Sequence, residues 1–493
     1  MNPPAVRLTS AATPASDTEA DWLVVGVPQE PVLDTALADL DLRLGGEIVR
    51  LREAGDVTGK ALELTPLLSP RGVRAKRILL VGLGASAGYS RAAFNDAAAA
   101  ALRSVTGKQH ARIALLLPGD TGSLDRATAT LGAAVGAVQG CYGPGLKKAE
   151  PSRFAPTEIA VLGAEPATLR RAQAEANAVT FARELVNRPP SELYPESFAA
   201  VARESGPRVE CEVWDEARLA AERMGAILGV AAAAARPPRM VVLRYSNGGA
   251  MPPLALVGKG VTFDSGGLSL KTTEQMVDMK CDMAGAATVL AAVRAAAELE
   301  LPVNLLGVLP LVENMPGGRA MKLGDVLHAR NGKTIEVLNT DAEGRLILAD
   351  ALAYAVDQRP GYVVDLATLT GSCMIALGTE IAGLMSNDDV WAKRVRDAIV
   401  RAGERAWPLP MDADFEDLIR GKVADLKNVG PSRFGGAIVG GKFLEQFVAD
   451  VPWVHLDIAG PAWADHDGPT RDVGGTGAYV RSLIELAATY GSE

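Results

Sequence analysis

Short apolar runs alternate with Ala-rich segments of helical spacing along this chain, and this alternation limits the fold more than any other feature. Residues 93–105 and 126–138 have the helical spacing. The apolar runs around them are residues 22–27, 77–82, 112–117 and 158–162. Runs of this length predict strands, and the segments between them predict helices that cross over a sheet. The pattern therefore predicts an α/β domain over residues 21–165, preceded by a disordered N-terminus at residues 1–20.

A long helix is predicted where this first domain ends. Thr168 to Asn187 contains good helix formers and is followed by two prolines, which cannot continue a helix. We therefore assign residues 166–195 to a connecting helix and linker. Further apolar runs follow at residues 240–245, 254–257, 303–309, 335–338, 362–366 and 453–456. Because helical segments separate these runs, residues 196–493 are predicted to form a larger α/β domain with a central mixed sheet.

The composition argues against several classes of protein. The formal net charge is −9 and no long run of Lys or Arg occurs, which argues against binding to the phosphate backbone of a nucleic acid. The 4 cysteines are widely spaced and form no C-x-x-C pair, so neither a zinc knuckle nor a disulfide framework is predicted. The N-terminus lacks the pattern of a secretory signal, and the apolar runs are too short to span a membrane. We therefore expect a cytoplasmic protein that makes no contact with membranes.

The densest group of polar residues is the segment NTDAEGR at residues 339–345. It lies between the predicted strand at residues 335–338 and a helical segment at residues 346–355. Open α/β sheets bind their ligands at the carboxyl ends of strands. If the segment is extended, the two-residue period of a strand places Asp341, Glu343 and Arg345 on one side. Two carboxylates and a guanidinium are then predicted to converge.

A second polar group follows the predicted strand at residues 254–257. It contains Lys259, Asp264 and Lys271, and Asp282 comes next at the head of an Ala-rich helix. Charged groups this close to an apolar strand are costly to desolvate unless they hold one another or a metal.

Together the two groups predict a site for two divalent metal ions. Two such ions would balance the four negative charges of Asp264, Asp282, Asp341 and Glu343. The 4 histidines include no His-x-x-x-His arrangement, so oxygen ligands suited to magnesium, manganese or zinc are expected. The alternative is that these carboxylates form ordinary salt bridges with Lys259, Lys271 and Arg345.

The two groups closely resemble the signatures of the leucyl aminopeptidase family, and NTDAEGR is the most specific of these motifs. The match also covers residues 259–271, 282–287, 313–316, 365–371 and 455–460, and so extends over nearly the whole second domain. The resemblance implies that residues 196–493 form a catalytic metallopeptidase domain. The implied activity is removal of single N-terminal residues from peptides, preferably leucine and other apolar residues, by water that two metal ions activate.

The resemblance also implies roles for individual residues. One ion, manganese or zinc, would be bound by Lys259, Asp264, Asp282 and Glu343. A second ion would be bound by Asp264, Asp341 and Glu343. The catalytic pair would be Lys271 and Arg345, with a bicarbonate held by Arg345 as proton shuttle. The substrate would be contacted by Met279, Thr368, Leu369 and Gly371, and the assembly would be a homohexamer.

Two segments depart from the usual family pattern. Val439-Gly440-Gly441 stands where relatives usually have Thr-Ala-Ala, and Gly474-Gly475-Thr476-Gly477 replaces Gly-Ala-Thr-Gly. Neither segment contains a predicted ligand, so they bear on pocket packing and subunit contacts rather than on the reaction.

Two other functions remain as alternatives. A two-metal phosphatase would also bind its ions through carboxylates, but it would need more cationic groups to hold phosphate. DNA binding, which occurs in some bacterial relatives, is disfavoured by the acidic net charge.

Overall fold

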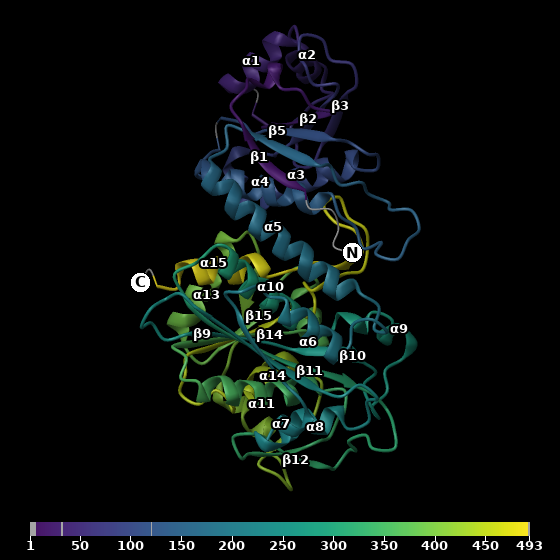
Figure 1. Ribbon diagram of the computed structural model, residues 1–493, viewed down its shortest axis with the longest axis vertical. Coiled ribbons are helices and arrows are strands. Elements are labelled where there is room, and N and C mark those ends of the chain that lie inside the picture. The colour runs from purple at the N-terminus through teal and green to yellow at the C-terminus, as the bar shows by residue number, and fades with distance from the viewer. Residues whose placement is uncertain (1–5, 31–32, 120, 492–493) are drawn as a thin grey trace. The chain divides into compact units, whose positions relative to one another are not determined.

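The computed structural model describes residues 6–30, 33–119 and 121–491. The chain divides into two compact units, which we call unit 1 and unit 2. Unit 1 comprises Met1–Thr180 and His466–Val473, and unit 2 comprises Phe181–Asp465 and Gly474–Glu493. Both are α/β, and the long helix α5 (Pro166–Asn187) runs from unit 1 into unit 2 (Figure 1). The predicted fold class, a smaller N-terminal α/β domain joined by a long helix to a larger one, is confirmed.

Unit 1 is built on a six-stranded sheet of order β1-β6-β5-β2-β4-β3. Neighbouring strands are parallel except β3, which is antiparallel to β4. Apolar residues alternate between the faces, so that α3 and α4 cover one face and α1 and α2 the other. The elements are β1 (Arg7–Ala11), β2 (Trp22–Val27), β3 (Leu64–Leu67), β4 (Ile78–Gly82), β5 (Arg112–Leu116), β6 (Glu158–Leu162), α1 (Thr35–Arg43), α2 (Glu47–Ala54), α3 (Arg91–Val105) and α4 (Arg126–Gly140).

The N-terminal segment differs from the disordered stretch expected at residues 1–20. Residues 1–5 lie outside the described residues, but strand β1 follows and pairs in parallel with β6. The Thr9 hydroxyl donates to Glu158 Oε1 at 2.7 Å. This strand is only partly buried and has no apolar run, so its stability comes from backbone pairing with a partner about 150 residues away in the chain. Sequence periodicity carries no signal for such a strand.

Residues His466–Val473 belong to unit 1 although they come late in the chain, so the two units do not follow the order of the sequence. Within unit 1, Asp472 accepts hydrogen bonds from Arg153 at 2.9 Å and forms an ion pair with Arg103 at 2.6 Å. The predicted boundary at residue 165 falls at the start of α5, whereas the two units divide within that helix, after Thr180.

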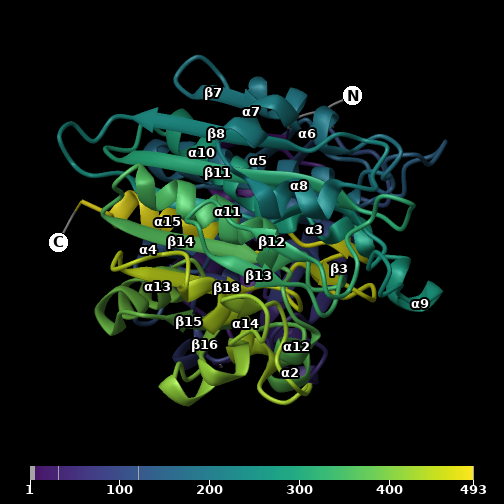
Figure 2. The ribbon, with the colours of Figure 1, turned by 90° about the horizontal axis from the view of Figure 1, so that it is seen from below.

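Unit 2 contains a nine-stranded mixed sheet of order β16-β15-β18-β14-β9-β11-β8-β7, and β10 also pairs with β11. Figure 2 shows this order as a succession of strands from β7 and β8 to β15 and β16. The central strands β18, β14, β9 and β11 are parallel, and the antiparallel pairs lie toward the edges. The strands are β7 (Glu210–Trp214), β8 (Arg239–Ser246), β9 (Leu254–Gly258), β10 (Gly260–Asp264), β11 (Asn304–Asn314), β14 (Tyr362–Ala367), β15 (Ala382–Ser386), β16 (Ala406–Pro408) and β18 (Trp453–Asp457).

Helices cover both faces of this sheet. In Figure 1, α10, α13 and α15 lie on one face and α8, α11 and α14 on the other. Helices α10 and α11 are buried on nearly all sides, which explains their almost uniformly apolar sequences. The helices are α6 (Pro195–Arg203), α7 (Glu216–Ala221), α8 (Gly225–Ala231), α9 (Thr273–Met276), α10 (Ala284–Glu298), α11 (Gly344–Asp357), α12 (Gly371–Leu377), α13 (Asp389–Arg401), α14 (Gly436–Glu445) and α15 (Val480–Thr489).

The apolar run predicted as a strand at residues 335–338 does not join the central sheet. It contributes β13 (Thr334–Glu336) to a separate three-stranded sheet with β12 (Val326–His328) and β17 (Leu426–Lys427). A two-stranded sheet of β19 (Trp463–Ala464) and β20 (Gly474–Gly475) completes unit 2. Across the part of the chain that the structure describes, no helix is long and apolar enough to cross a membrane.

Candidate functional site

The polar group that follows the strand at residues 254–257 lies where β9 and β10 meet and where β10 ends. Lys259 is the single residue between these strands, and its backbone N–H donates to Leu366 O of β14 at 3.0 Å. Asp264 is the last residue of β10 and is buried. Its Oδ1 accepts from Asn314 Nδ2 at 2.8 Å and from Gly266 N at 2.9 Å. Both residues are therefore anchored at the carboxyl ends of strands in the middle of the sheet.

The polar group at residues 339–345 lies in the loop between β13 and α11 and in the first turn of α11. The Thr340 hydroxyl donates to Gly266 O at 2.6 Å and accepts from Ser269 N at 2.8 Å, so this loop is tied to the loop after β10. An extended loop would place Asp341, Glu343 and Arg345 on one side, but the loop is not extended as far as residue 345. Glu343 already has helical backbone angles (φ −76°, ψ −32°), and Arg345 lies in the first turn of α11. The convergence of carboxylates thus comes from a helix start and not from strand alternation.

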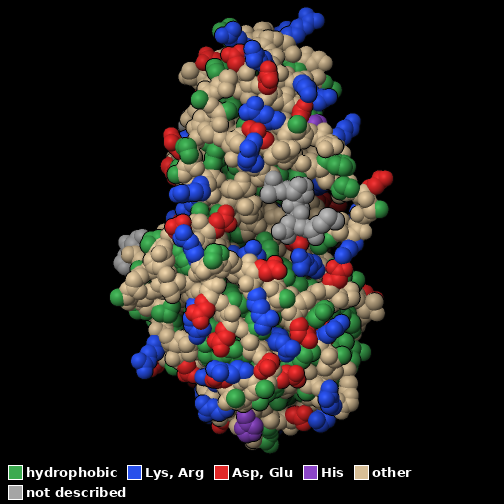
Figure 3. All heavy atoms as spheres, in the orientation of Figure 1, with side chains coloured by type: hydrophobic (Ala, Val, Ile, Leu, Met, Phe, Trp, Pro, Cys, Tyr) green, Lys and Arg blue, Asp and Glu red, His purple; other side chains and the backbone are tan. Residues whose placement is uncertain are grey.

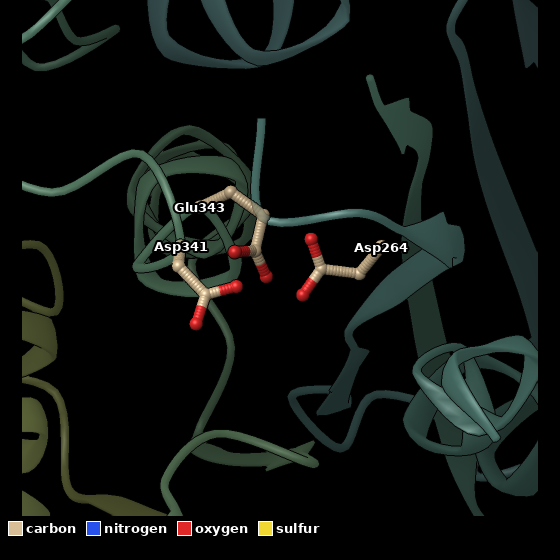
Figure 4. A group of neighbouring side chains, drawn as sticks. All are labelled: Asp264, Asp341 and Glu343. Carbon is tan, nitrogen blue, oxygen red and sulfur yellow. The ribbon is translucent and has the colours of Figure 1, made fainter. Parts of the chain in front are cut away.

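Three carboxylates converge in this site. Asp264, Asp341 and Glu343 each offer one oxygen, and these atoms lie within 4.8 Å of one another. Figure 4 shows the three side chains pointing toward a common centre, Asp264 from one side and Asp341 and Glu343 from the other. This spacing allows the three oxygens to bind a single cation.

Two lysines, the buried Lys259 and the half-buried Lys271, are interleaved with the carboxylates. Lys259 Nζ lies 2.8 Å from Asp282 Oδ1 and 3.0 Å from Glu343 Oε1, and it donates to Thr368 O at 2.9 Å. Lys271 Nζ lies 2.9 Å from Asp264 Oδ2 and 2.5 Å from Asp341 Oδ1. Four carboxylates thus face two ammonium groups, and the set keeps an excess of negative charge.

Burial and charge shift the pKa values of these groups. Burial alone would lower the pKa of Lys259. The facing carboxylates, chiefly Asp282 and Glu343, raise this pKa by more than burial lowers it, so the net shift is upward. Burial raises the pKa of Asp282, and the negative charges of Glu343 and Asp264 add to this rise. The excess negative charge therefore disfavours ionisation of Asp282, a condition that added cations relieve.

The donor set fits divalent metal ions. Asp282 Oδ2 and Glu343 Oε2 are buried and have no hydrogen-bond partner among the residues that the structure describes. A buried carboxylate oxygen without a partner is costly, and a bound cation would satisfy both atoms. Carboxylate oxygens are suitable ligands for manganese and zinc.

Arg345 is buried beside this cluster. Its Nη1 donates to Asn428 O at 2.9 Å, and its Nε has no partner among the described residues. Burial lowers the pKa of Arg345 to about 10, and the charges of Glu343 and Asp457 oppose this shift only in part. The guanidinium is thus positively charged at neutral pH and retains one N–H for a further acceptor.

The predicted substrate residues lie on two segments next to the lysines and carboxylates. Met279 belongs to the 3₁₀ helix Met279–Cys281 that leads to Asp282. Thr368 and Leu369 follow β14, and Gly371 is the first residue of α12. The Thr368 hydroxyl donates to Asp282 Oδ1 at 2.7 Å, so this segment contacts the site directly.

Sequence reasoning assigned no role to two buried residues that hold the site together. Asn314 Nδ2 donates both to Asp264 and, at 3.0 Å, to Thr340 O, and so bridges the two polar groups. Asp457 accepts from the loop that carries Thr368 and Leu369. Each is a polar residue at the end of a long or fully buried strand, β11 or β18, and that position was the available signal.

Comparison with known proteins agrees with this geometry. Residues 180–484 match the catalytic domain of the cytosol aminopeptidase family, and residues 24–147 match its N-terminal domain. A probable cytosol aminopeptidase of Rhodopirellula baltica is 46% identical over 98% of this chain and 96% of its own length. Another from Solibacter usitatus is 43% identical over 98% of this chain and 99% of its own length.

Solved structures resemble the whole chain as well. A mutant of tomato leucine aminopeptidase has a TM-score of 0.89 and 34% identity, covering 99% of this chain and 97% of that one. The bottromycin maturation enzyme BotP in complex with Mn has a TM-score of 0.85 and 37% identity, covering 96% and 99%. Since both domains match along nearly their full length, the chain belongs to the cytosol aminopeptidase family and is a metal-dependent aminopeptidase, a hydrolase that acts on peptides.

Proposed function

We propose that this aminopeptidase uses two divalent ions, manganese or zinc, and prefers peptides that begin with leucine or another apolar residue. The observation that carries the proposal is the convergence of four carboxylates on two lysines, of which Lys259 is buried and Lys271 half-buried, with two carboxylate oxygens that have no hydrogen-bond partner among the described residues. One ion would be held by Lys259, Asp264, Asp282 and Glu343. The other would be held by Asp264, Asp341 and Glu343, with Asp264 and Glu343 shared.

The ions, when bound, would supply an activated water and would polarise the scissile carbonyl. Lys271 pairs with Asp264 and Asp341, and only 13% of its side chain is exposed. Its ammonium group would stabilise the negative charge that develops on the carbonyl oxygen of the substrate. This role requires Lys271 to remain protonated, and the Asp264 and Asp341 carboxylates favour the charged form.

Arg345 would hold a bicarbonate that accepts and returns the proton of the attacking water. Two features support this part of the proposal. The buried Nε has no partner among the described residues, and α14 presents a glycine, Gly440, to the guanidinium. A Cβ at Gly440 would lie 3.5 Å from Arg345 Nη2, an ordinary van der Waals contact, so a side chain there would occupy space that glycine leaves free beside the guanidinium.

The substrate would be contacted by Met279, Thr368, Leu369 and Gly371. Thr368 and Leu369 are half-buried and Gly371 is exposed, so the segment after β14 joins the carboxylate cluster to the surface. The preference for leucine is drawn from the tomato leucine aminopeptidase, whose fold this chain shares.

The proposal includes a homohexamer in the cytoplasm. A monomer by light scattering at working concentration would contradict the hexamer. DNA binding is not favoured, because the formal net charge is −9. On the face shown in Figure 3, Lys and Arg side chains lie among Asp and Glu side chains. A gel shift at two salt concentrations tests for DNA binding, since binding driven by phosphates weakens steeply with salt.

Treatment with a chelator tests the catalytic part of the proposal. The chelated protein should lose hydrolysis of leucine anilide, and added manganese or zinc should restore it with two ions bound per chain. N-acetyl-leucine anilide should be cleaved very poorly, because acetylation removes the amine lone pair that a metal would bind. Full activity without metal, or equal cleavage of the blocked substrate, would refute the mechanism. Cleavage of a phosphate ester in place of the anilide would support the phosphatase alternative.

A further inference from the structure

A buried carboxylate outside the proposed ligand set lies close to the site. Asp457 is the last residue of β18 and has no exposed surface. Its strand runs parallel to β14, and the register pairs Asp457 with Ala367, the last residue of β14. The chain leaves β14 immediately afterwards and forms the loop Thr368–Thr370 before α12 begins.

Asp457 accepts hydrogen bonds from this loop with both carboxylate oxygens. Oδ1 accepts from the backbone N–H of Leu369 at 3.2 Å and from that of Thr370 at 3.4 Å. Oδ2 accepts from the Thr370 hydroxyl at 2.6 Å. Oδ1 also accepts from Ala459 N at 3.2 Å, which closes the turn after β18. A single side chain thus holds two successive N–H groups and one hydroxyl of the loop.

The same loop makes two contacts with the proposed ligands. Thr368 O accepts from Lys259 Nζ at 2.9 Å, and the Thr368 hydroxyl donates to Asp282 Oδ1 at 2.7 Å. The Thr368 carbonyl and the Leu369 N–H belong to one peptide group, which is planar and trans. Because Asp457 accepts from the N–H end of this group, it sets the direction in which the carbonyl end points toward Lys259.

We infer that Asp457 is a positioning residue: through the peptide group between Thr368 and Leu369 it fixes Lys259 and Asp282, and thereby one of the two metal ions. The inference rests on the proposed function, which assigns Lys259 and Asp282 to one ion only. The other ion would be held by Asp264, Asp341 and Glu343. Among the described residues, none of these three forms a hydrogen bond or an ion pair with the Thr368–Thr370 loop.

The role requires a carboxylate and not merely a polar side chain. All the loop groups that Asp457 meets are donors, and they occupy both of its oxygens. In Asp457→Asn the NH₂ group either faces the backbone N–H groups, from which it cannot accept, or faces the Thr370 hydroxyl, which must then accept from it and loses its own acceptor at Oδ2. In either case the charge-assisted hydrogen bonds of the carboxylate are lost, so the change keeps the size of the side chain but weakens its hold on the loop.

Titration calorimetry of chelator-treated protein with Mn²⁺ tests the inference. Wild-type protein should bind two ions, and Asp457→Asn should bind one ion normally and the other roughly 10–100-fold more weakly, the usual effect of removing a group that orients a metal ligand. Asp365→Asn is a matched control. Asp365 is equally buried on β14, but it accepts from Trp453 Nε1 and pairs with His455 instead of the loop, so this variant should bind both ions normally.

Two results would overturn the inference. One is a folded Asp457→Asn protein that binds both ions with wild-type affinity, and the other is an equal loss in Asp365→Asn. If Asp457→Asn does not fold, Thr370→Val and Thr370→Ser replace it, because only serine keeps the hydroxyl for Oδ2. Thr370→Val alone should then weaken one ion, and equal binding by both variants would refute the role. Wild-type protein that binds fewer than two ions would instead refute the proposed function.

Discussion

A single methyl group added at Gly344 should disturb the site strongly. It is the first residue of α11, and its φ is not positive, so alanine fits the backbone there. A Cβ at this position would lie 2.5 Å from Lys259 Cε, 2.6 Å from Nζ and 2.8 Å from Cδ. An ordinary contact begins at 3.4 Å, so in Gly344→Ala the Lys259 side chain must move by roughly 1 Å.

The size of the effect follows from what holds Lys259. Its ammonium makes three contacts of 2.8 to 3.0 Å in a buried site, and a shift of this size cannot preserve all of them. Breaking a buried ion pair costs about 3–5 kcal/mol. Alanine gains about 1 kcal/mol over glycine in a helix, so we expect a net loss of about 2–4 kcal/mol in the unfolding free energy of the metal-free protein. A reacting group misplaced by about 1 Å typically costs 100-fold in rate, and we expect a loss of that order in turnover.

The assay compares Gly344→Ala with Gly318→Ala, where an added Cβ meets nothing within 4 Å and φ is again not positive. Turnover of leucine anilide and the number of bound metal ions are measured for both variants after loading with manganese. Gly318→Ala should match the wild type in both. Near-native turnover and two bound ions in Gly344→Ala would refute the reasoning, because they would show that Lys259 is free to move without consequence.

Three further changes test the site and the fold around it. Glu343→Gln should lose metal and activity while keeping its circular dichroism spectrum, and near-native turnover would contradict the ligand assignment. Lys259→Arg keeps the positive charge but offers no lone pair to a metal, so metal content and turnover should fall, whereas a simple salt-bridge role predicts a nearly silent change. Burial raises the pKa of Asp350 to about 7 although three backbone N–H groups donate to its carboxylate. The folded protein then binds this proton more tightly than the unfolded chain, so unfolding free energies measured between about pH 4 and pH 7 should fall as pH rises, and Asp350→Asn should flatten that fall; equal slopes for both proteins would contradict the burial argument.

The fold class could be predicted because its signal is local. Strands of the central sheets are buried on both faces, so they appear as short apolar runs, and the helices between them have regular apolar spacing. The prediction failed where stability comes from distant partners. Strand β1 has no apolar run of its own, so the sequence pattern gave no sign of it. The apolar run at residues 335–338 suggested a central strand, but β13, which contains part of this run, pairs with β12 and β17.

The members of the candidate site were also predictable, since charged residues next to buried strands need a reason to be there. Which lysine pairs with which carboxylate could not be predicted. The sequence allowed Lys259 to pair with Asp264, whereas in the structure Lys259 faces Asp282 and Glu343, and Lys271 faces Asp264. Nothing in the spacing of these residues distinguishes the two pairings, because the choice depends on where the loops after β10 and before α11 meet in space.

Hydrogen bonds between distant segments fix the place where the loops after β10 and before α11 meet. The effect of a substitution at the site therefore depends on whether it removes a proposed ligand or one of these hydrogen bonds. Asn314, Thr340 and Asp457 each link segments that are far apart in the chain, and none of them belongs to the proposed ligand set. A proposed ligand such as Asp341 contributes charge and one oxygen, and its loss leaves these links in place. Loss of a link leaves every ligand present but alters the distances among them. Ligand variants should therefore lose metal while the loops keep their geometry, whereas link variants should shift the geometry first and lose metal as a result.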